Sequence, residues 1–399
     1  MTTADLVLHG ARLITGHDSP PPASDGWVAV LDGRIAGLGT GEPPAATDSV
    51  DVGGDWLAPG YVDVHMHGGA GGDVMAPDRE ARDAVRRLHA QHGTTAMLAS
   101  TVSRPVDDLV AAVDRLADDV ERPDTGEPVA RLIGIHLEGP FLSRVRRGAH
   151  QETALRLPDL TIADELLAAG RGHVRTITVA PELPGGLDLI RHLVVAGVIA
   201  AVGHTDADAA TVGEAVRAGA RAMTHTYNAM QGLHHRRPGA VGMAMDLSQL
   251  TCELIFDLVH VDPIAARALV HAAGADRICL VTDAMAATGM SDGTYELGGQ
   301  VVEVVDGQAR VRGTNTLAGS TLTMGTAVQN AVAHLGIDVP TAVAMATTIP
   351  AGLLHGVDVG RLHADGPADM VRLDEDARLC GVWVSGRQVA PSPKEVTAP

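Results

Sequence analysis

Two histidines separated by one residue could bind a metal ion near the start of the chain's long middle region. They lie in Pro59-Gly60-Tyr61-Val62-Asp63-Val64-His65-Met66-His67-Gly68-Gly69, where Val62 to Met66 alternates apolar with polar residues and predicts a β-strand. Side chains two residues apart leave the same face of a strand, so His65 and His67 should hold one ion between their imidazoles. Alone, a His-x-His pair is a weak signal, because many such pairs are surface or core residues.

Four more candidate ligands occur where other apolar segments end. Glu138, His204, His225 and Asp283 each close a segment of strand length. Taken singly, a buried histidine is usually a hydrogen-bonded core residue, and Asp283 could equally cap a helix. Six such residues at equivalent positions are harder to explain separately. Four imidazoles and two carboxylates suit one or two divalent transition-metal ions.

The elements that must position these residues alternate between strand-like and helix-like segments. Apolar runs separated by stretches rich in Ala, Leu, Asp and Arg are typical of parallel strands buried on both faces. Eight such runs predict an α/β fold, a (β/α)₈ TIM-like barrel with its active site at the C-terminal strand ends. The runs are Val62–Met66, Thr94–Leu98, Leu132–Glu138, Thr176–Ala180, Ile199–His204, Ala222–His225, Glu253–Val259 and Ile278–Asp283.

Both ends of the chain have a different pattern from the middle. Residues 1–58 and 353–399 consist of short alternating segments broken by Gly, Pro and Asp, which predict strands and turns. We expect these two parts to form one small β-sandwich domain beside a barrel domain at residues 59–352. Residues 287–320, rich in Gly, Thr and Val, predict a β-hairpin inserted after the eighth barrel strand.

Composition and charge exclude several classes of function. The chain has 30 Lys and Arg against 49 Asp and Glu, a net charge of −19, and no basic cluster, which argues against a nucleic-acid partner. No apolar run reaches membrane-spanning length and the first residues lack the features of a signal peptide, so we expect a cytoplasmic protein without a membrane partner. The scattered Cys252, Cys279 and Cys380 fit free thiols in a reducing compartment.

A single lysine, Lys394 in a Pro-rich tail, limits the chemistry further. Reactions that need a buried lysine are excluded, among them Schiff-base and pyridoxal phosphate chemistry, a P-loop, and a metal pair bridged by carbamylated lysine. An acidic chain that binds an anion must concentrate positive charge locally. Arginine or histidine must therefore provide that charge.

Several strings around these polar residues carry a resemblance along the chain. They are His136-Leu137-Glu138-Gly139-Pro140-Phe141, Arg147-Gly148-Ala149-His150, Gly203-His204-Thr205, Thr224-His225-Thr226-Tyr227-Asn228-Ala229-Met230, Val281-Thr282-Asp283-Ala284 and Leu317-Ala318-Gly319-Ser320. Together with the His-x-His segment, the chain resembles the amidohydrolase superfamily, and within it the N-acetylglucosamine-6-phosphate deacetylase family. His-x-His is shared by the whole superfamily, whereas the Leu-Glu-Gly-Pro-Phe and Thr-His-x-Tyr-Asn-Ala-Met strings are specific to this branch.

The resemblance implies hydrolysis of N-acetyl-D-glucosamine 6-phosphate to D-glucosamine 6-phosphate and acetate, in amino-sugar catabolism and cell-wall recycling. It implies one or two divalent ions per subunit, with zinc expected and Fe, Mn, Co or Cd as alternatives. Some family members replace His-x-His by Gln and Asn and bind a single ion. The implied ligand sets are Glu138, His204 and His225 for one ion, and His65, His67 and Glu138 for the second, with Asp283 close by.

Amide hydrolysis needs an activated water, a polarised carbonyl and a proton for the leaving amine. Asp283, beside a metal-bound water, fits as general base and then as acid toward the amine. His150 lies in the loop after the third strand, and the resemblance implies that it contacts the substrate near the scissile amide. Without that resemblance it would be read as a surface histidine.

No Gly-x-x-x-x-Gly-Lys phosphate loop is present, so another group must bind the phosphate. The resemblance implies Arg236 and His260 as its ligands, and implies that this contact can come from the neighbouring subunit of a homodimer with sites near the interface. An arginine fork matches phosphate bidentately, although Arg236 could instead be a solvated loop charge. Asn228, Ala229 and Leu317 are the other expected substrate-binding residues.

Two alternatives stay open. One is a different amidohydrolase, such as a D-aminoacylase-like or isoaspartyl-dipeptidase-like enzyme, in which Arg236 would bind a carboxylate. A requirement for the 6-phosphate would distinguish it. The other is an inactive scaffold of the kind found among dihydropyrimidinase relatives. Such scaffolds lose metal ligands, whereas every expected ligand type is present here.

Overall fold

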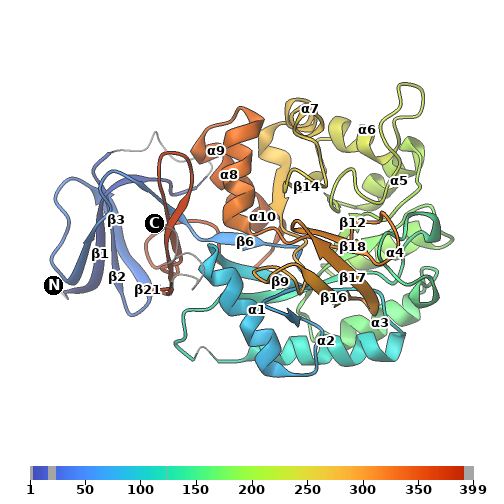
Figure 1. Ribbon diagram of the computed structural model, residues 1–399, viewed down its shortest axis with the longest axis horizontal. Coiled ribbons are helices and arrows are strands. Elements are labelled where there is room, and N and C mark those ends of the chain that lie inside the picture. Colours follow the sequence, from blue (N-terminus) through green and yellow to red (C-terminus); the bar gives the residue numbers. More distant parts are fainter. Residues whose placement is uncertain (1–2, 17–23, 124, 391–399) are drawn as a thin grey trace.

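The computed structural model describes residues 3–16, 24–123 and 125–390, so Lys394 lies outside the described residues. Two bodies lie side by side, a large barrel surrounded by helices and a smaller β body (Figure 1). The first and last described strands, Ala4–Leu13 and Arg387–Gln388, both belong to the smaller body. The predicted boundaries at residues 58 and 353 stay a prediction.

The larger body is a parallel sheet of eight strands that curls into a nearly closed barrel, which confirms the predicted fold. Each strand pairs with the next one along the chain. The strands are β6 (Tyr61–Asp63), β9 (Thr94–Thr101), β10 (Arg131–Glu138), β11 (Val174–Val179), β12 (Ile199–Val202), β13 (Ala222–Met223), β14 (Thr251–Ile255) and β15 (Ile278–Val281).

The first and last barrel strands are joined by hydrogen bonds at and just beyond their ends. Among the described residues no backbone ladder links β6 to β15. The buried carboxylate of Asp63 accepts hydrogen bonds from the hydroxyl of Thr282 at 2.6 Å and from its backbone N–H at 3.4 Å, and the backbone N–H of Asp283 donates to the carbonyl of His65 at 2.9 Å. Strand β6 is also shorter than predicted. It ends at Asp63, so His65 and His67 follow the strand instead of sharing one of its faces.

Helices cover the outside of the barrel. Six of them begin at an aspartate or threonine whose side chain accepts a hydrogen bond from the first turn, namely Asp78, Asp159, Asp208, Asp262, Thr323 and Asp338. Such a cap contributes about 1 kcal/mol to helix stability. The helices are α1 (Arg79–Gln91), α2 (Val106–Glu121), α3 (Leu160–Ala169), α4 (Gly186–Val195), α5 (Ala209–Ala218), α6 (Gly239–Asp246), α7 (Pro263–Ala273), α8 (Met324–Leu335), α9 (Val339–Ala346) and α10 (Thr348–Leu353).

The smaller body combines strands from both ends of the chain. The long strand β1 pairs with β2 and β4 through its first part and with β5 through Arg12 and Leu13, so it belongs to both layers of a sandwich. Buried side chains from the two layers, including Val28 and Trp383, pack in one cluster. The strands are β1 (Ala4–Leu13), β2 (Gly26–Leu31), β3 (Arg34–Thr40), β4 (Ala46–Asp51), β5 (Trp56–Pro59), β19 (Met370–Leu373), β20 (Leu379–Val384) and β21 (Arg387–Gln388).

A third, smaller sheet lies over the barrel strands in Figure 1. It consists of β16 (Gly293–Leu297), β17 (Gln300–Val305) and β18 (Gln308–Val311), and so extends the predicted hairpin by one strand. Short segments add β7 (Gly68–Gly69), β8 (Gly72–Asp73), η1 (Arg144–Arg146), η2 (Glu152–Ala154) and η3 (Ala275–Arg277).

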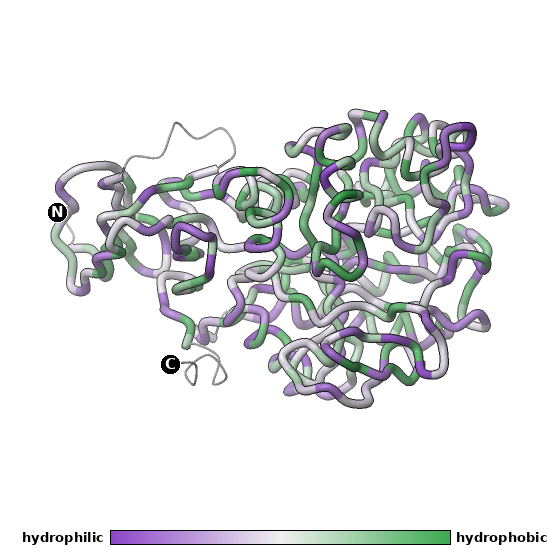
Figure 2. Tube along the Cα trace, turned by 45° about the horizontal axis from the view of Figure 1, so that its top comes forward, coloured by the Kyte–Doolittle hydropathy of each residue, from purple (hydrophilic) through white to green (hydrophobic). Residues whose placement is uncertain are grey.

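Hydrophobic stretches run through the interior of the larger body, and hydrophilic residues are concentrated in loops at its edge (Figure 2). Within the described ranges, no helix combines the length and the apolar character needed to cross a membrane.

Candidate active site

The six predicted metal ligands and acid–base residues converge at one end of the barrel. Each is buried, and each ends a barrel strand or follows it closely. The backbone at three of them is unusual, because His204, His225 and Asp283 have φ values of 46°, 28° and 49°. Non-glycine residues rarely adopt this left-handed conformation, which costs of order 1–3 kcal/mol and clusters at functional sites. It turns the chain sharply where each of these strands ends.

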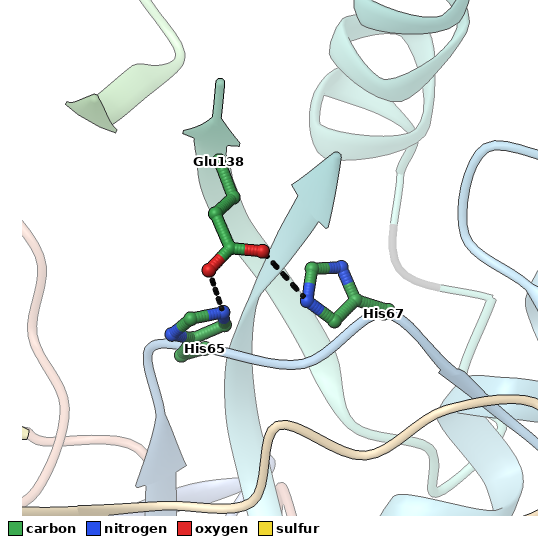
Figure 3. A group of neighbouring side chains, drawn as sticks. All are labelled: His65, His67 and Glu138. Carbon is green, nitrogen blue, oxygen red and sulfur yellow. Dashed lines mark ion pairs between the residues drawn. The ribbon is translucent and has the colours of Figure 1, made fainter. Parts of the chain in front are cut away.

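Glu138 is the centre of this cluster. One carboxylate oxygen, Oε1, lies 3.3 Å from His65 Nε2, and the other, Oε2, lies 3.3 Å from His67 Nε2. Figure 3 shows the two imidazoles approaching the two oxygens from the segment after β6, while Glu138 extends from the end of β10. The same Oε1 lies 3.1 Å from His204 Nε2 and 3.0 Å from His225 Nε2. A single carboxylate thus contacts all four histidines.

The arrangement fits two metal sites that share Glu138. Candidate ligand atoms within 4.8 Å of one another form two groups, His65, His67 and Glu138, and Glu138, His204 and His225. In a tetrahedral zinc site, ligand atoms about 2.0–2.1 Å from the ion lie roughly 3.3 Å from one another. The Nε2 atoms of His204 and His225 are 2.9 Å apart, slightly closer than this.

Hydrogen bonds on the far side of two imidazoles leave a lone pair on the inward nitrogen whenever the ring is neutral, which is the form that binds a metal ion. His67 Nδ1 lies 2.9 Å from the carbonyl oxygen of Ser100, and His204 Nδ1 lies 2.9 Å from that of Arg146. A carbonyl only accepts, so Nδ1 is the donor in both rings and Nε2 of the neutral ring is unprotonated. These lone pairs face the oxygens of Glu138, and His65 Nε2 is buried without a hydrogen-bond partner. A cation would relieve the repulsion among them, so the residues fit a metal ion.

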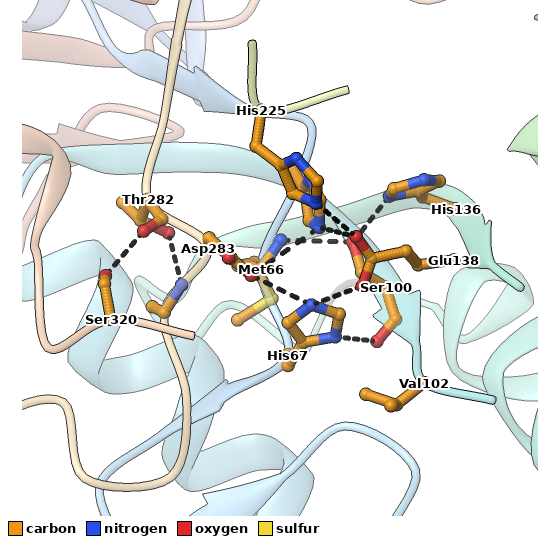
Figure 4. A network of polar contacts seen from close by, with 12 residues as sticks. Met66, His67, Ser100, Val102, His136, Glu138, His225, Thr282, Asp283 and Ser320 are labelled. Atoms are coloured by element: carbon orange, nitrogen blue, oxygen red, sulfur yellow. Dashed lines mark hydrogen bonds and ion pairs between the residues drawn. The ribbon is translucent and has the colours of Figure 1, made fainter. Parts of the chain in front are cut away.

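The electrostatics of the cluster also favour a cation. Burial lowers the pKa of His67, but hydrogen bonds to Asp283 and Glu138 outweigh it and raise that pKa to about 9. Burial raises the pKa of Asp283, but the charge of His65 and a hydrogen bond from His67 outweigh it and lower that pKa to about 2. Figure 4 shows His67 between Asp283, Glu138 and Ser100. The same negative field that holds protons on these imidazoles would attract a divalent ion.

His150 lies beside this cluster with a defined tautomer. The backbone N–H of Ser103 donates to His150 Nδ1 at 3.2 Å, so Nδ1 accepts and the proton of the neutral ring is on Nε2. His150 Nε2 lies 3.2 Å from Glu138 Oε2. Burial lowers the pKa of His150 to about 4, which keeps the ring neutral at pH 7. The side chain is therefore a neutral hydrogen-bond donor, and it is buried rather than on the surface.

A cavity of about 340 Å³ opens onto the cluster and brings most of the predicted substrate residues together. Its lining includes the catalytic candidates together with Asn228, Ala229, His260 and Leu317. Arg236 is not part of this lining. It lies exposed in the loop before α6, where its guanidinium contacts His235 at 3.0 Å. The cavity of the same chain therefore does not include the predicted phosphate arginine.

Two residues near the site were missed from the sequence. Arg310 lines the cavity from β18, and it is the one arginine among the described lining residues. Glu253 of β14 is buried beneath the metal cluster and contacts His65. A signal existed only for Glu253, because a carboxylate inside an otherwise apolar barrel strand is unusual. Arg310 lies in a surface-like hairpin whose fold over the cavity no local pattern reveals.

Comparison with known proteins agrees with this geometry. The amidohydrolase family model matches residues 56–389. The N-acetylgalactosamine-6-phosphate deacetylase of Escherichia coli O157:H7 is 36% identical over 96% of this chain and 98% of its own length. The N-acetylglucosamine-6-phosphate deacetylase of Bacillus subtilis (strain 168) is 38% identical over 75% of this chain and 76% of its own.

A solved structure extends the match over the whole fold. A mutant of N-acetyl-D-glucosamine-6-phosphate deacetylase from Mycobacterium smegmatis, in complex with N-acetyl-D-glucosamine-6-phosphate, has a TM-score of 0.90 and 40% identity. The alignment covers 98% of this chain and 100% of that chain. The resemblance inferred from the sequence is thereby confirmed. The chain belongs to the amidohydrolase family, and within that family it groups with the N-acetylglucosamine-6-phosphate deacetylases.

Proposed function

We propose that this protein is a metal-dependent deacetylase that hydrolyses N-acetyl-D-glucosamine 6-phosphate to D-glucosamine 6-phosphate and acetate. One observation carries the proposal: four imidazoles converge on the shared carboxylate of Glu138, and this carboxylate lines a cavity together with Asp283. The relatives described above are all deacetylases of N-acetylated hexosamine 6-phosphates. The activity would serve amino-sugar catabolism and cell-wall recycling.

The two ligand groups would hold one or two divalent ions. Zinc suits imidazole and carboxylate donors, and Fe, Mn, Co or Cd are accepted by similar sets. A bound divalent ion lowers the pKa of its water toward about 7 and polarises an amide carbonyl. The buried free thiols of Cys252 and Cys279 support a reducing, cytoplasmic location.

Asp283 would move the proton. Its depressed pKa of about 2 leaves it a carboxylate at neutral pH, as a general base requires. An oxygen of Asp283 accepts a proton from the attacking water. It then returns this proton to the amine nitrogen as the C–N bond breaks and acetate forms.

His150 would orient and stabilise the acetamide. The one proton of its neutral ring is on Nε2, beside Glu138 in the cavity lining, because Nδ1 accepts from Ser103. The oxygen of the scissile carbonyl gains negative charge as water adds, and a neutral, preorganised donor stabilises that charge. The acid–base step therefore comes from Asp283, just after β15, and this hydrogen bond from the loop after β10.

Arg310 and His260 supply positive charge for the 6-phosphate within one chain. Both line the cavity. His260 Nδ1 lies 2.7 Å from Asp257 Oδ2, which leaves Nε2 available for a ligand. Arg310 donates to the carbonyl of Asn315 at 2.7 Å and to the side-chain oxygen of Gln308 at 2.9 Å, and no carboxylate pairs with it in the part of the chain that the structure describes. Its charge is thus not neutralised before the substrate binds.

Arg236 would act across the interface of a homodimer. It is exposed and lies outside its own cavity, in a loop that also exposes the apolar Leu233. A partner subunit could receive this loop at its phosphate site. Mixing Arg236→Ala with Asp283→Asn subunits should then restore part of the activity, because one of the two sites in a mixed dimer has both residues intact. No recovery on mixing would place Arg236 outside the partner's site.

A second candidate substrate is N-acetyl-D-galactosamine 6-phosphate, because a relative matched over 98% of its length carries that activity in its name. Acetate release from both 6-phosphates and from unphosphorylated N-acetylglucosamine separates the possibilities. We expect the highest kcat/KM for N-acetyl-D-glucosamine 6-phosphate and a loss of activity on metal removal. No hydrolysis of either phosphorylated sugar by the metal-loaded protein would refute the proposal.

A further inference from the structure

Glu253 is a buried carboxylate for which the reaction described above has no use. It lies on β14, faces the underside of the histidine cluster and is 2% exposed. Within the described ranges its one ion-pair partner is His65, whose Nδ1 lies 2.9 Å from Glu253 Oε2. Burying a carboxylate is costly unless charged or polar groups compensate for it. We therefore expect this buried carboxylate, directly beneath the candidate metal ligands, to have a specific role.

The same oxygen contacts both candidate metal groups. Besides His65 in the first group, Glu253 Oε2 accepts a hydrogen bond from the backbone N–H of His225, in the second group, at 3.1 Å. The backbone of His225 has a φ of 28° and therefore needs support. The imidazole of His225 is not held by a hydrogen bond at Nδ1, because this nitrogen is buried without a hydrogen-bond partner. The orientation of the His225 imidazole consequently depends on the backbone that Glu253 holds.

We infer that Glu253 is a positioning residue that orients His65 and His225 and thereby supports both metal groups. Toward His65 it acts through the ring: a carboxylate on Nδ1–H fixes the tautomer with Nε2 free and makes that nitrogen a stronger ligand. Toward His225 it acts through the main chain, which is the weaker coupling. The inference rests on the metal centre of the proposed function and on no assumption about the substrate.

The expected effect of Glu253→Gln is therefore unequal at the two groups. The glutamine amide is nearly isosteric with the glutamate carboxylate, but it carries no charge, so His65 Nε2 becomes a weaker metal ligand. Loss of such a supporting partner typically weakens metal binding 10- to 100-fold. We expect a weakening of this size for the ion bound by His65 and His67, and a smaller change for the ion bound through His225.

The test measures metal binding, with no substrate present. Metal-free wild type and variants are titrated with Co²⁺ and followed by visible absorption, and bound ions per chain are counted by mass spectrometry after dialysis. Asp369→Asn is the matched control, because Asp369 is also buried and also accepts from a backbone N–H, that of Ser385 at 2.8 Å, at the junction with the smaller body. This control should bind Co²⁺ as the wild type does.

A double-mutant cycle tests whether Glu253 acts through His65. In a His65→Ala background, Glu253→Gln should cause no further loss of metal affinity at the group of His65, His67 and Glu138. Glu253→Asp keeps the negative charge but moves it away from His65 by one methylene. It should therefore also weaken binding of the ion held by His65 and His67. Circular dichroism of each metal-free variant checks that it is folded.

The outcomes separate the inference from the proposed function. A wild type that binds no divalent ion contradicts the metal centre itself. A wild type that binds ions, with folded Glu253→Gln and Glu253→Asp that match its affinity and spectrum, overturns the inference alone. A loss of Co²⁺ affinity in Asp369→Asn as large as that in Glu253→Gln would also overturn the inference, because the effect would then be a general destabilisation of the fold.

Discussion

Replacing Arg310 by alanine should weaken binding of the phosphorylated substrate and leave the unphosphorylated one nearly unaffected. The guanidinium is held by neutral acceptors only, the carbonyl of Asn315 and the side chain of Gln308, so its full charge is available to a phosphate. A charge-assisted hydrogen bond contributes about 1.5–3 kcal/mol, which corresponds to a rise in KM of about 10- to 150-fold. Unphosphorylated N-acetylglucosamine never makes this contact.

The assay is steady-state acetate release from both substrates, by Arg310→Ala and by a neighbouring control. Arg312 is the control because it lies two residues away, is half exposed and pairs with Glu303 at 2.7 Å, outside the cavity lining. Arg312→Ala should leave both KM values at their wild-type level. An equal loss on both substrates in Arg310→Ala would refute the phosphate contact and indicate that Arg310 supports the hairpin instead.

Three further predictions concern the metal, the proton and pH. His225→Ala should remove the ion bound with His204 and abolish nearly all activity, whereas His65→Ala should cost less if the ion bound by His65 and His67 only assists; metal analysis with kcat checks both. Asp283→Asn should lower kcat by about two to four orders of magnitude with metal content unchanged, and near-normal turnover would exclude it as the base. Burial lowers the pKa of His260, but the hydrogen bond and the charge of Asp257 outweigh burial and raise this pKa above its usual value. The imidazole of His260 therefore stays protonated to a higher pH than that of an ordinary histidine. KM for the phosphorylated substrate should rise as the pH increases through that raised pKa. In Asp257→Asn the same rise in KM should occur at a lower pH, because the carboxylate that raises the pKa of His260 is gone. A KM that does not depend on pH contradicts this prediction.

The sequence predicted the barrel because its signals are local. Apolar runs of strand length and polar residues at strand ends can each be recognised within a few residues. The end of the first strand was placed too late, since alternation continues past Asp63 although the ladder stops there. The histidines still converge, because Glu138 reaches both from the neighbouring part of the barrel.

What the sequence could not predict depends on contacts between distant segments. The tautomer of His150 follows from a backbone N–H at Ser103, and Glu253 meets His65 across 188 positions of the chain. Arg310 reaches the cavity only because β16 to β18 fold over it. Arg236 illustrates the opposite case, because this residue was assigned by family resemblance and lies outside the cavity of its own chain.

Deacetylation by the purified protein, with its metal content controlled, tests whether this chain is a metal-dependent deacetylase. Metal-free protein and protein reconstituted with Zn²⁺ are compared for acetate release from N-acetyl-D-glucosamine 6-phosphate, with bound ions counted in the same samples. We predict one or two ions per chain after reconstitution, rapid acetate release only in their presence, and much slower release from unphosphorylated N-acetylglucosamine. Acetate release that is equally fast without metal, or none with it, would show that this protein is not a metal-dependent deacetylase of this sugar phosphate.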